Sequence, residues 1–194
     1  MNVLYLHGFR SSPQSMKAAL LRGHFAETQH RFVCPQLPAS PAAAIELASA
    51  LIEDRGEPAR DWALVGSSLG GYYATYLAER YGCRAVVLNP AVQPVRDLAA
   101  HVGALTMFHS DAPFIWREEY LEELAALSVG RITRPERYLL IAAKGDELLD
   151  WREMVAHYAG ARQIVLEGGD HGISMFADYL EEVASFCAEG TVSA

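Results

Sequence analysis

Residues 62–74, WALVGSSLGGYYA, decide the fold, because they join a short apolar run to a helical pattern through a glycine-rich turn. The run WALV is typical of a buried strand, and the apolar residues after the turn recur at three- and four-residue spacing. The turn itself, residues 66–70, reads G-x-S-x-G with Ser68 at its centre; Ser67 does not fit, because valine and leucine stand two positions before and after it. In this pattern a serine is held in a strained conformation that exposes its hydroxyl. Ser68 is therefore the candidate nucleophile, with a purely structural turn as the alternative.

Short aliphatic runs alternate with helical patterns along most of the chain. The runs predicted as strands, each apolar enough to be buried on both faces, are 3–6, 32–34, 62–65, 85–88, 138–143 and 163–166. The predicted helices, which carry apolar residues at helical spacing, cover 15–27, 41–54, 70–82, 151–160 and 175–189. This alternation predicts an α/β fold, with a mostly parallel sheet of about six strands covered by helices on both faces.

The alternation is interrupted once, between residues 91 and 137. This stretch holds several prolines and helical patterns near 94–101 and 116–127, and no run in it predicts a strand. A connection of that length within a sheet is either functional or a packed excursion. We therefore expect a single domain over residues 1–194, with residues 91–137 as a small helical cap insertion.

Composition excludes several classes of partner. The formal net charge of −8 argues against a surface for nucleic acid or anionic membranes. The three cysteines Cys34, Cys83 and Cys187 lie far apart without metal-site spacing, as free thiols of a reducing compartment do. The first residues lack the basic leader of a signal peptide, and no apolar stretch approaches the roughly 20 residues of a membrane span. A soluble, cytoplasmic protein is expected.

A serine nucleophile needs a base, and the carboxyl ends of parallel strands are where functional groups gather. His171 meets this requirement, because it follows the last predicted strand in the loop EGGDHG. His7 follows the first predicted strand, and we assign it to ordering its loop rather than to a second base. The histidines that fall within helices or away from strand ends, and are expected at the surface or in packing, are His24, His30, His101, His109 and His157.

The base in turn needs a carboxylate to fix its tautomer. Asp146 lies just past the strand YLLIAA and is the first choice, with Glu147 as its nearest rival. Asp150 is better explained as a helix N-cap, since Asp150 and Glu153 have the spacing of a capping box. Asp170 shares the loop of His171 and would orient the ring poorly.

Two backbone N–H groups should meet the negative charge that develops on an attacked carbonyl oxygen. Leu69 supplies one as the residue after the nucleophile. Phe9 is the candidate for the other, because Gly8 lets the loop after the first strand approach closely. A simple turn at His7-Gly8 is the alternative.

The motifs LYLHGFRSSPQSMKA, PQLP, GSSLGGYYATYLAE, NPAVQP, GDELLDWRE and EGGDHG together resemble the YqiA-like esterases, a family within the α/β-hydrolase superfamily. The resemblance runs from residue 3 to the final helix and is weakest across 97–137. It implies a compact α/β-hydrolase fold and a serine esterase of short-chain acyl esters, without metal or organic cofactor. It also places the nucleophile, acid and base on Ser68, Asp146 and His171, in the chain order of that superfamily.

The partner implied by this resemblance is a small-molecule acyl ester or thioester. His7 and Tyr72 are candidates for substrate contact, although core packing is expected for at least one of Tyr72 and Tyr73. The apolar stretch 108–116, FHSDAPFIW, either lines an acyl pocket or docks the cap. Two alternative functions remain open, namely a thioesterase or acyltransferase with the same triad, and a non-catalytic binding module on the same fold.

Overall fold

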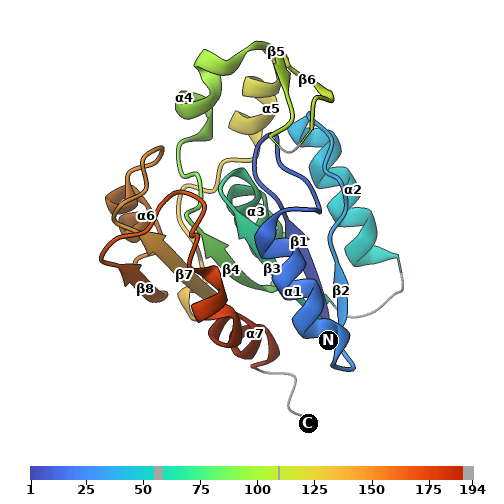
Figure 1. Cartoon of the computed structure of the whole chain (residues 1–194), viewed down its shortest axis with the longest axis vertical. Helices are drawn as coiled ribbons and strands as arrows, with labels where there is room; N and C mark the ends of the chain where they lie inside the picture. The colour runs from blue at the N-terminus through green and yellow to red at the C-terminus, as the bar shows by residue number, and fades with distance from the viewer. Residues whose placement is uncertain (55–58, 109, 190–194) are drawn as a thin grey trace.

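A computed structural model describes residues 1–54, 59–108 and 110–189 of the chain (Figure 1). Its main feature is a six-stranded sheet in which all neighbours are parallel, in the order β2-β1-β3-β4-β7-β8. The strands are β1 (Asn2–Leu6), β2 (Arg31–Val33), β3 (Trp62–Ser67), β4 (Arg84–Leu88), β7 (Tyr138–Ala143) and β8 (Arg162–Leu166). The six strands predicted from the sequence are therefore confirmed, each to within a residue or two at its ends.

The strands read as continuous apolar runs because both faces of the sheet are covered. In β1, Leu4 and Leu6 belong to the core cluster on one face, whereas Val3 and Tyr5 belong to the cluster on the other. Full burial of one such aliphatic side chain contributes about 1.5–3 kcal/mol relative to exposure. The strands β1, β3, β4 and β7 are therefore held from both sides.

Helices cover the two faces unequally, as Figure 1 shows. The helices that place side chains in the core cluster of Leu4 are α2 (Pro41–Glu53), α3 (Leu69–Tyr81), α5 (Glu119–Ala126) and α6 (Trp151–His157). Those that contribute to the opposite cluster are α1 (Met16–Ala26) and α7 (Leu180–Ala188). All five predicted helices are confirmed, although the last begins later, after a 3₁₀ turn. Within the described residues, no helix is both long and apolar enough to cross a membrane.

The segment between β4 and β7 corrects the prediction that residues 91–137 contain no strand. Besides α4 (Pro94–Leu98) and α5 (Glu119–Ala126), it forms an antiparallel hairpin of β5 (Gly103–Thr106) and β6 (Pro113–Trp116), called the hairpin below. Pro113 is tolerated because it is the first residue of β6 and the hairpin is a sheet of only two strands. The helical patterns near 94–101 and 116–127 are confirmed.

Packing holds the hairpin in place. Trp116 is only 1% exposed and joins the main core cluster, whereas its neighbour Ile115 is 54% exposed. The ring of Phe9, in the loop after β1, lies 5.0 Å from the ring of Trp116. The hairpin therefore lies over the carboxyl end of β1, where the sequence places functional groups.

Candidate active site

Ser68 occupies the sharp turn between β3 and α3. Its φ is 56° and its ψ is −121°, a left-handed conformation that costs a non-glycine residue on the order of 1–3 kcal/mol. The surrounding backbone holds it there, because the Ser68 N–H donates to the Leu88 carbonyl and the Ser68 carbonyl accepts from Gly71 and Ala91. The strained turn predicted from G-x-S-x-G is therefore present in the structure.

The glycines of the turn are required by close backbone approach. A Cβ on Gly66 would lie 2.2 Å from the Gly70 carbonyl oxygen, and one on Gly70 would lie 1.9 Å from the Leu6 carbonyl oxygen. A Cβ on Gly8 would lie 3.2 Å from the Cβ of Ser68, so the loop after β1 runs directly against the serine. Any larger residue at 66 or 70 would push strand and helix apart.

Ser68, His171 and Asp146 form a hydrogen-bonded chain. The Ser68 Oγ lies 3.0 Å from His171 Nε2, and His171 Nδ1 lies 2.8 Å from Asp146 Oδ2. The carboxylate is an acceptor, so the neutral ring carries its proton on Nδ1 and leaves Nε2 free to accept from the serine hydroxyl. The Asp146 side chain is 0% exposed and that of His171 is 18% exposed, so solvent reaches the imidazole but not the carboxylate. The structure thus brings together the three residues that the sequence singles out.

Both partners of the serine are fixed by the loops that carry them. Asp146 Oδ1 also accepts from the backbone N–H groups of Leu148 and Leu149, each at 2.9 Å. The buried Asn89, just after β4, donates from Nδ2 to the carbonyls of Asp170 and His171, at 3.0 and 3.1 Å. The sequence contains no signal for this link between Asn89 and the histidine loop, because it depends on the order of strands in the sheet.

The rival carboxylates have other partners. Glu147 Oε2 accepts from the backbone N–H of His171, at 2.9 Å, rather than from its ring. Asp170 accepts from the N–H and hydroxyl of Ser174, and these hydrogen bonds lower the pKa of its carboxyl. The geometry therefore favours Asp146 over both.

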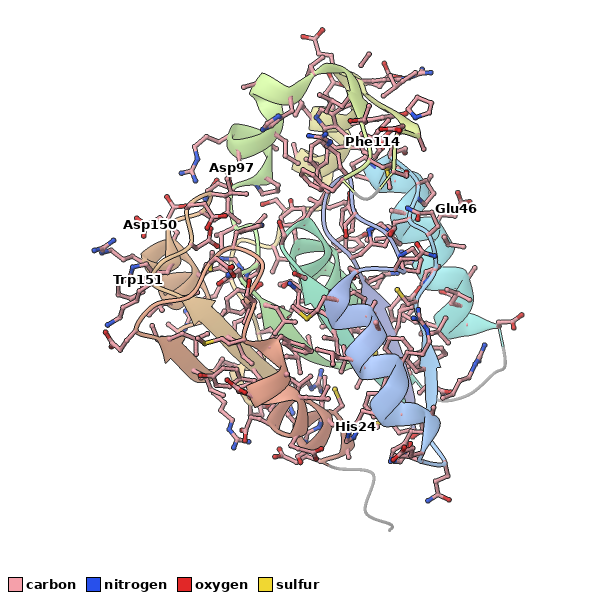
Figure 2. All side chains as sticks on the ribbon, viewed as in Figure 1. His24, Glu46, Asp97, Phe114, Asp150 and Trp151 are labelled. Atoms are coloured by element: carbon pink, nitrogen blue, oxygen red, sulfur yellow. The ribbon has the colours of Figure 1, made fainter. Side chains whose placement is uncertain are left out.

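Asp150 caps α6, as predicted. Its Oδ1 accepts from the N–H of Arg152 at 2.9 Å, and it stands directly before Trp151 at the start of the helix (Figure 2). The part expected for Glu153 in the capping box is wrong. Its carboxylate instead forms a bidentate ion pair with Arg96, at 2.8 Å for each contact.

Two backbone N–H groups lie beside the serine without a hydrogen-bond partner among the described residues. They belong to Phe9, which follows Gly8, and to Leu69, which follows Ser68 and begins α3. The first N–H groups of a helix have no partner within it, so the amide of Leu69 is free for a ligand. These are the two amides proposed from the sequence.

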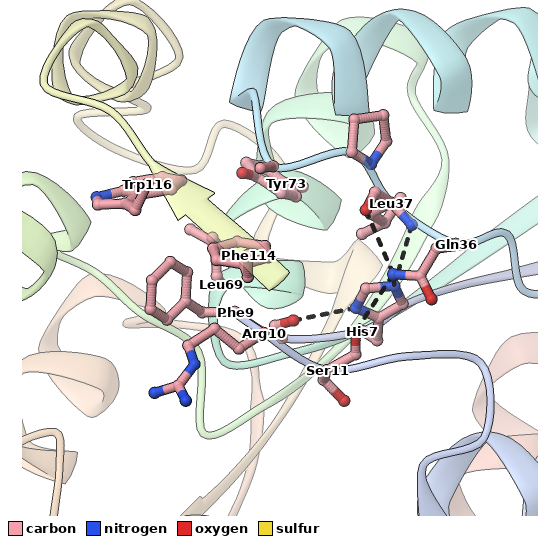
Figure 3. A pocket seen from close by; sticks show the side chains of 13 residues that line it. His7, Phe9, Arg10, Ser11, Gln36, Leu37, Leu69, Tyr73, Phe114 and Trp116 are labelled. Atoms are coloured by element: carbon pink, nitrogen blue, oxygen red, sulfur yellow. Dashed lines mark hydrogen bonds between the residues drawn. The ribbon is translucent and has the colours of Figure 1, made fainter. Parts of the chain in front are cut away.

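The two candidate substrate contacts are tied into the fold. His7 is buried; its Nδ1 donates to the Gly8 carbonyl and its Nε2 accepts from the Leu37 N–H, both at 3.0 Å (Figure 3). Burial lowers the pKa of His7. The Tyr72 hydroxyl donates to the Leu124 carbonyl at 2.7 Å, and burial raises the pKa of Tyr72 to about 12. These contacts fit the loop-ordering role expected for His7 and the packing role considered for Tyr72.

Two cavities meet at Ser68 and His171. The larger, about 410 Å³, has mostly apolar walls; these include Phe9, Leu69, Ala91, Leu98, Phe108, Leu148 and Leu149. The smaller, about 270 Å³, is more polar; its walls include Ser11, Ser15, Lys17 and Ser174. Burial lowers the pKa of Lys17 to about 8, and its ammonium donates to the Gly172 carbonyl. The serine hydroxyl thus lies between a mostly apolar cavity and a more polar one.

Described residues of the stretch 108–116 both line the cavities at Ser68 and dock the hairpin. Phe108 is 60% exposed and lines both cavities, whereas Phe114 and Trp116 dock the hairpin on Phe9. His101, expected only in packing or at the surface, lies in the wall of the larger cavity. His109 lies outside the described residues.

Across the part of the chain that the structure describes, no group of three or more His, Cys, Asp or Glu is arranged to hold a metal ion. Of the acidic side chains around the site, Asp146 and Glu147 are engaged with His171, and Asp170 is engaged with Ser174. The functional groups that the structure brings together at the site are a serine, an imidazole, a carboxylate and backbone amides.

Comparison with known proteins gives the family. The model of the uncharacterised protein family UPF0227 matches residues 2–188. A UPF0227 protein from Vibrio campbellii is 25% identical over 192 residues, covering 95% of this chain and 98% of the relative.

Solved structures share the fold at low identity. The mouse α/β-hydrolase domain-containing protein 10 is 15% identical with a TM-score of 0.72, covering 95% of this chain and 89% of that one. Est1E from Butyrivibrio proteoclasticus, with ferulic acid bound, is 13% identical with a TM-score of 0.74, covering 99% and 90% of the two chains. The chain therefore belongs to the UPF0227 (YqiA) family and has the α/β-hydrolase fold.

Proposed function

We propose that the protein is a serine esterase that hydrolyses short-chain acyl esters. The observation that carries this proposal is the chain of contacts from Ser68 Oγ to His171 Nε2 at 3.0 Å and from His171 Nδ1 to Asp146 at 2.8 Å. This chain lies at the junction of two cavities, so a substrate can present its acyl and alcohol parts on opposite sides of the hydroxyl. The solved structures with a similar fold include proteins described as esterases, which agrees with the proposal.

In the first step His171 Nε2 removes the proton of Ser68, whose oxygen attacks the ester carbonyl. The N–H groups of Phe9 and Leu69 donate to the resulting oxyanion, and the Asp146 carboxylate stabilises the imidazolium. His171 then gives its proton to the leaving alkoxide, and an acyl-enzyme forms on Ser68. In the second step His171 takes a proton from water, whose oxygen attacks the acyl carbonyl. His171 then returns that proton to Ser68 Oγ as the acyl–serine bond breaks, which releases the acid and restores the free serine.

We assign the acyl chain to the larger, more apolar cavity and the alcohol to the smaller, more polar one. Under this assignment residues 91–137 are a cap on the single domain, because Leu98, His101 and Phe108 close the acyl side. Packing of His7 and Tyr72 leaves them outside the proposed substrate contacts. The three cysteines are free, which favours action in a reducing cytoplasm.

Reaction with a fluorophosphonate probe tests the proposal, with Ser68→Ala and the matched neighbour Ser67→Ala beside the wild type. We expect an adduct on Ser68, found by mass spectrometry of the modified peptide, in the wild type and Ser67→Ala. Ser68→Ala should show no adduct and lose about 10⁶-fold in kcat toward a short-chain ester while melting at a similar temperature.

The same assay separates the alternative functions. A series of matched esters and thioesters would show whether thioester hydrolysis, or acyl transfer, is faster than ester hydrolysis. A folded wild type that takes no probe would contradict the esterase and favour a non-catalytic binding module.

A further inference from the structure

The loop that carries the Phe9 amide is fastened to the hairpin through Arg10. The Arg10 Nε donates to the Thr106 carbonyl at 2.5 Å, and Nη2 lies 3.4 Å from the Thr106 hydroxyl. The main chain joins the same contact, because the Arg10 carbonyl accepts from the Phe108 N–H at 2.9 Å. Both the side chain and the backbone of Arg10 are therefore bound to the hairpin.

Ring contacts reinforce this connection. The Phe9 ring meets the rings of Phe114 and Trp116 edge-on, with centroids 5.1 and 5.0 Å away, and Figure 3 shows the three side by side. The Arg10 guanidinium lies 4.4 Å from the centroid of Phe108, which lines both cavities. Cation–π and edge-to-face contacts are directional, so they fix orientation as well as distance.

The direction of the Phe9 N–H follows from the peptide that contains it. In a planar trans peptide the Phe9 N–H points opposite to the Gly8 carbonyl. That carbonyl accepts from His7 Nδ1 at 3.0 Å and from the Ser11 N–H at 3.2 Å. The second contact closes a β-turn from Gly8 to Ser11 with Arg10 in the third position.

Arg10 has a φ of 57° in this turn, a conformation typical of glycine at the third position of a type II turn. An arginine remains there only where surrounding contacts hold it. The contacts with Thr106 and Phe108 are those that the structure supplies. The hairpin therefore acts together with His7 to hold the turn, and with it the direction of the Phe9 amide.

We propose that Arg10 is a positioning residue, which binds the hairpin through Thr106 and Phe108 and thereby holds the Phe9 N–H toward the oxyanion formed at Ser68. The inference rests on the proposed esterase function and extends it by giving the hairpin a part in the oxyanion hole. A donor used only in the transition state affects kcat rather than substrate affinity.

Steady-state kinetics on a short-chain ester test the proposal with Arg10→Ala, Arg10→Gly and Arg10→Lys. Removal of a whole oxyanion donor costs about 10²–10³-fold in kcat, and a misdirected donor should cost about 10–100-fold with KM changed less than about threefold. Arg10→Gly is the discriminating variant, because glycine accepts the positive φ without the side-chain contacts. It should still lose kcat, because a glycine without the Thr106 contacts is not held in one conformation, but less than Arg10→Ala, which is also strained at the positive φ. Arg10→Lys, which keeps one donor for Thr106, should likewise lose less than Arg10→Ala.

Arg117→Ala is the matched control, since this exposed arginine of the same segment pairs only with Glu119 among the contacts described, and it should keep the wild-type kcat. A second readout is the affinity for a trifluoromethyl ketone, which forms a charged adduct with a nucleophilic serine. That affinity should fall by the same factor as kcat/KM in Arg10→Ala, without a change in melting temperature larger than a few degrees.

The outcomes separate the inference from the proposed function. If the wild type is active and Arg10→Gly keeps the wild-type kcat, the positioning role is overturned. A loss in the Arg10 variants that is confined to KM would overturn it as well. A wild type that neither hydrolyses esters nor takes the fluorophosphonate would overturn the esterase function and this inference together. Parallel losses of kcat and ketone affinity, larger in Arg10→Ala than in Arg10→Gly, would support the inference.

Discussion

The carboxyl edge of the sheet and the hairpin are built in different ways. At the sheet edge, Ser68 and Asp146 follow strands whose side chains are buried on both faces, and Asn89 links the end of β7 to the loop of His171. The hairpin has two four-residue strands, and it reaches the core mainly through Trp116. The positions of the reacting groups therefore depend on the core, whereas the position of the hairpin beside the cavities depends on a few aromatic contacts.

Asp146→Asn should give the largest effect among the changes that keep Ser68. An asparagine amide can donate to His171 Nδ1, which favours the tautomer that cannot accept the serine proton. We expect kcat to fall by about 10⁴-fold with little change in folding, as measured by ester hydrolysis and thermal melting.

Glu147→Gln is the control for this prediction. A glutamine oxygen can still accept from the His171 N–H, so activity should stay within a few-fold of wild type. Greater damage from Glu147→Gln than from Asp146→Asn would show that the acid is wrongly assigned.

Trp116→Ala tests how firmly the hairpin is docked. Truncation of a buried tryptophan typically lowers the free energy of unfolding by about 3–5 kcal/mol, which urea denaturation would measure. The exposed neighbour Ile115→Ala should change it by less than about 0.5 kcal/mol. Equal and small effects from the two variants would mean that the hairpin is not part of the cooperative core.

His7 gives the smallest predicted effect, through pH. Burial holds its folded pKa below the ordinary value near 6.5, so between the two values the unfolded chain binds more protons than the folded one. The free energy of unfolding should therefore fall as pH drops below about 6.5, by at most about 1.4 kcal/mol per pH unit from this group.

Denaturation of wild type and His7→Asn across this pH range isolates the contribution of His7 from those of other histidines. The variant should show the shallower pH dependence. A steeper dependence in His7→Asn would contradict a buried, neutral imidazole that accepts from Leu37.

Sequence periodicity could predict the sheet because burial on both faces leaves a local signature. Val3 and Leu4 face opposite clusters, and each such pair makes the strand a continuous apolar run. The site residues could be predicted for the related reason that carboxyl ends of parallel strands meet at one edge. The choice between Asp146 and Glu147 needed geometry, since the two are adjacent and only their contacts with the ring and backbone of His171 distinguish them.

The hairpin left no comparable signature. Its strands GALT and PFIW are short, one begins with Pro113, and only Trp116 is fully buried, so neither shows a clear alternation. Their conformation depends on packing against Phe9 and Arg10, about a hundred residues away in the chain. Long-range contacts of this kind cannot be predicted from local pattern.

Asn89 removes conformational freedom from the active-site loops before a substrate arrives. Its one amide group accepts from the Ala143 N–H and donates to two carbonyls of the histidine loop, so it ties the ends of two strands to His171. Ordering of that loop is part of the entropy of folding, and substrate binding does not have to supply it again. The entropic cost that remains in the reaction is therefore chiefly that of placing the ester itself.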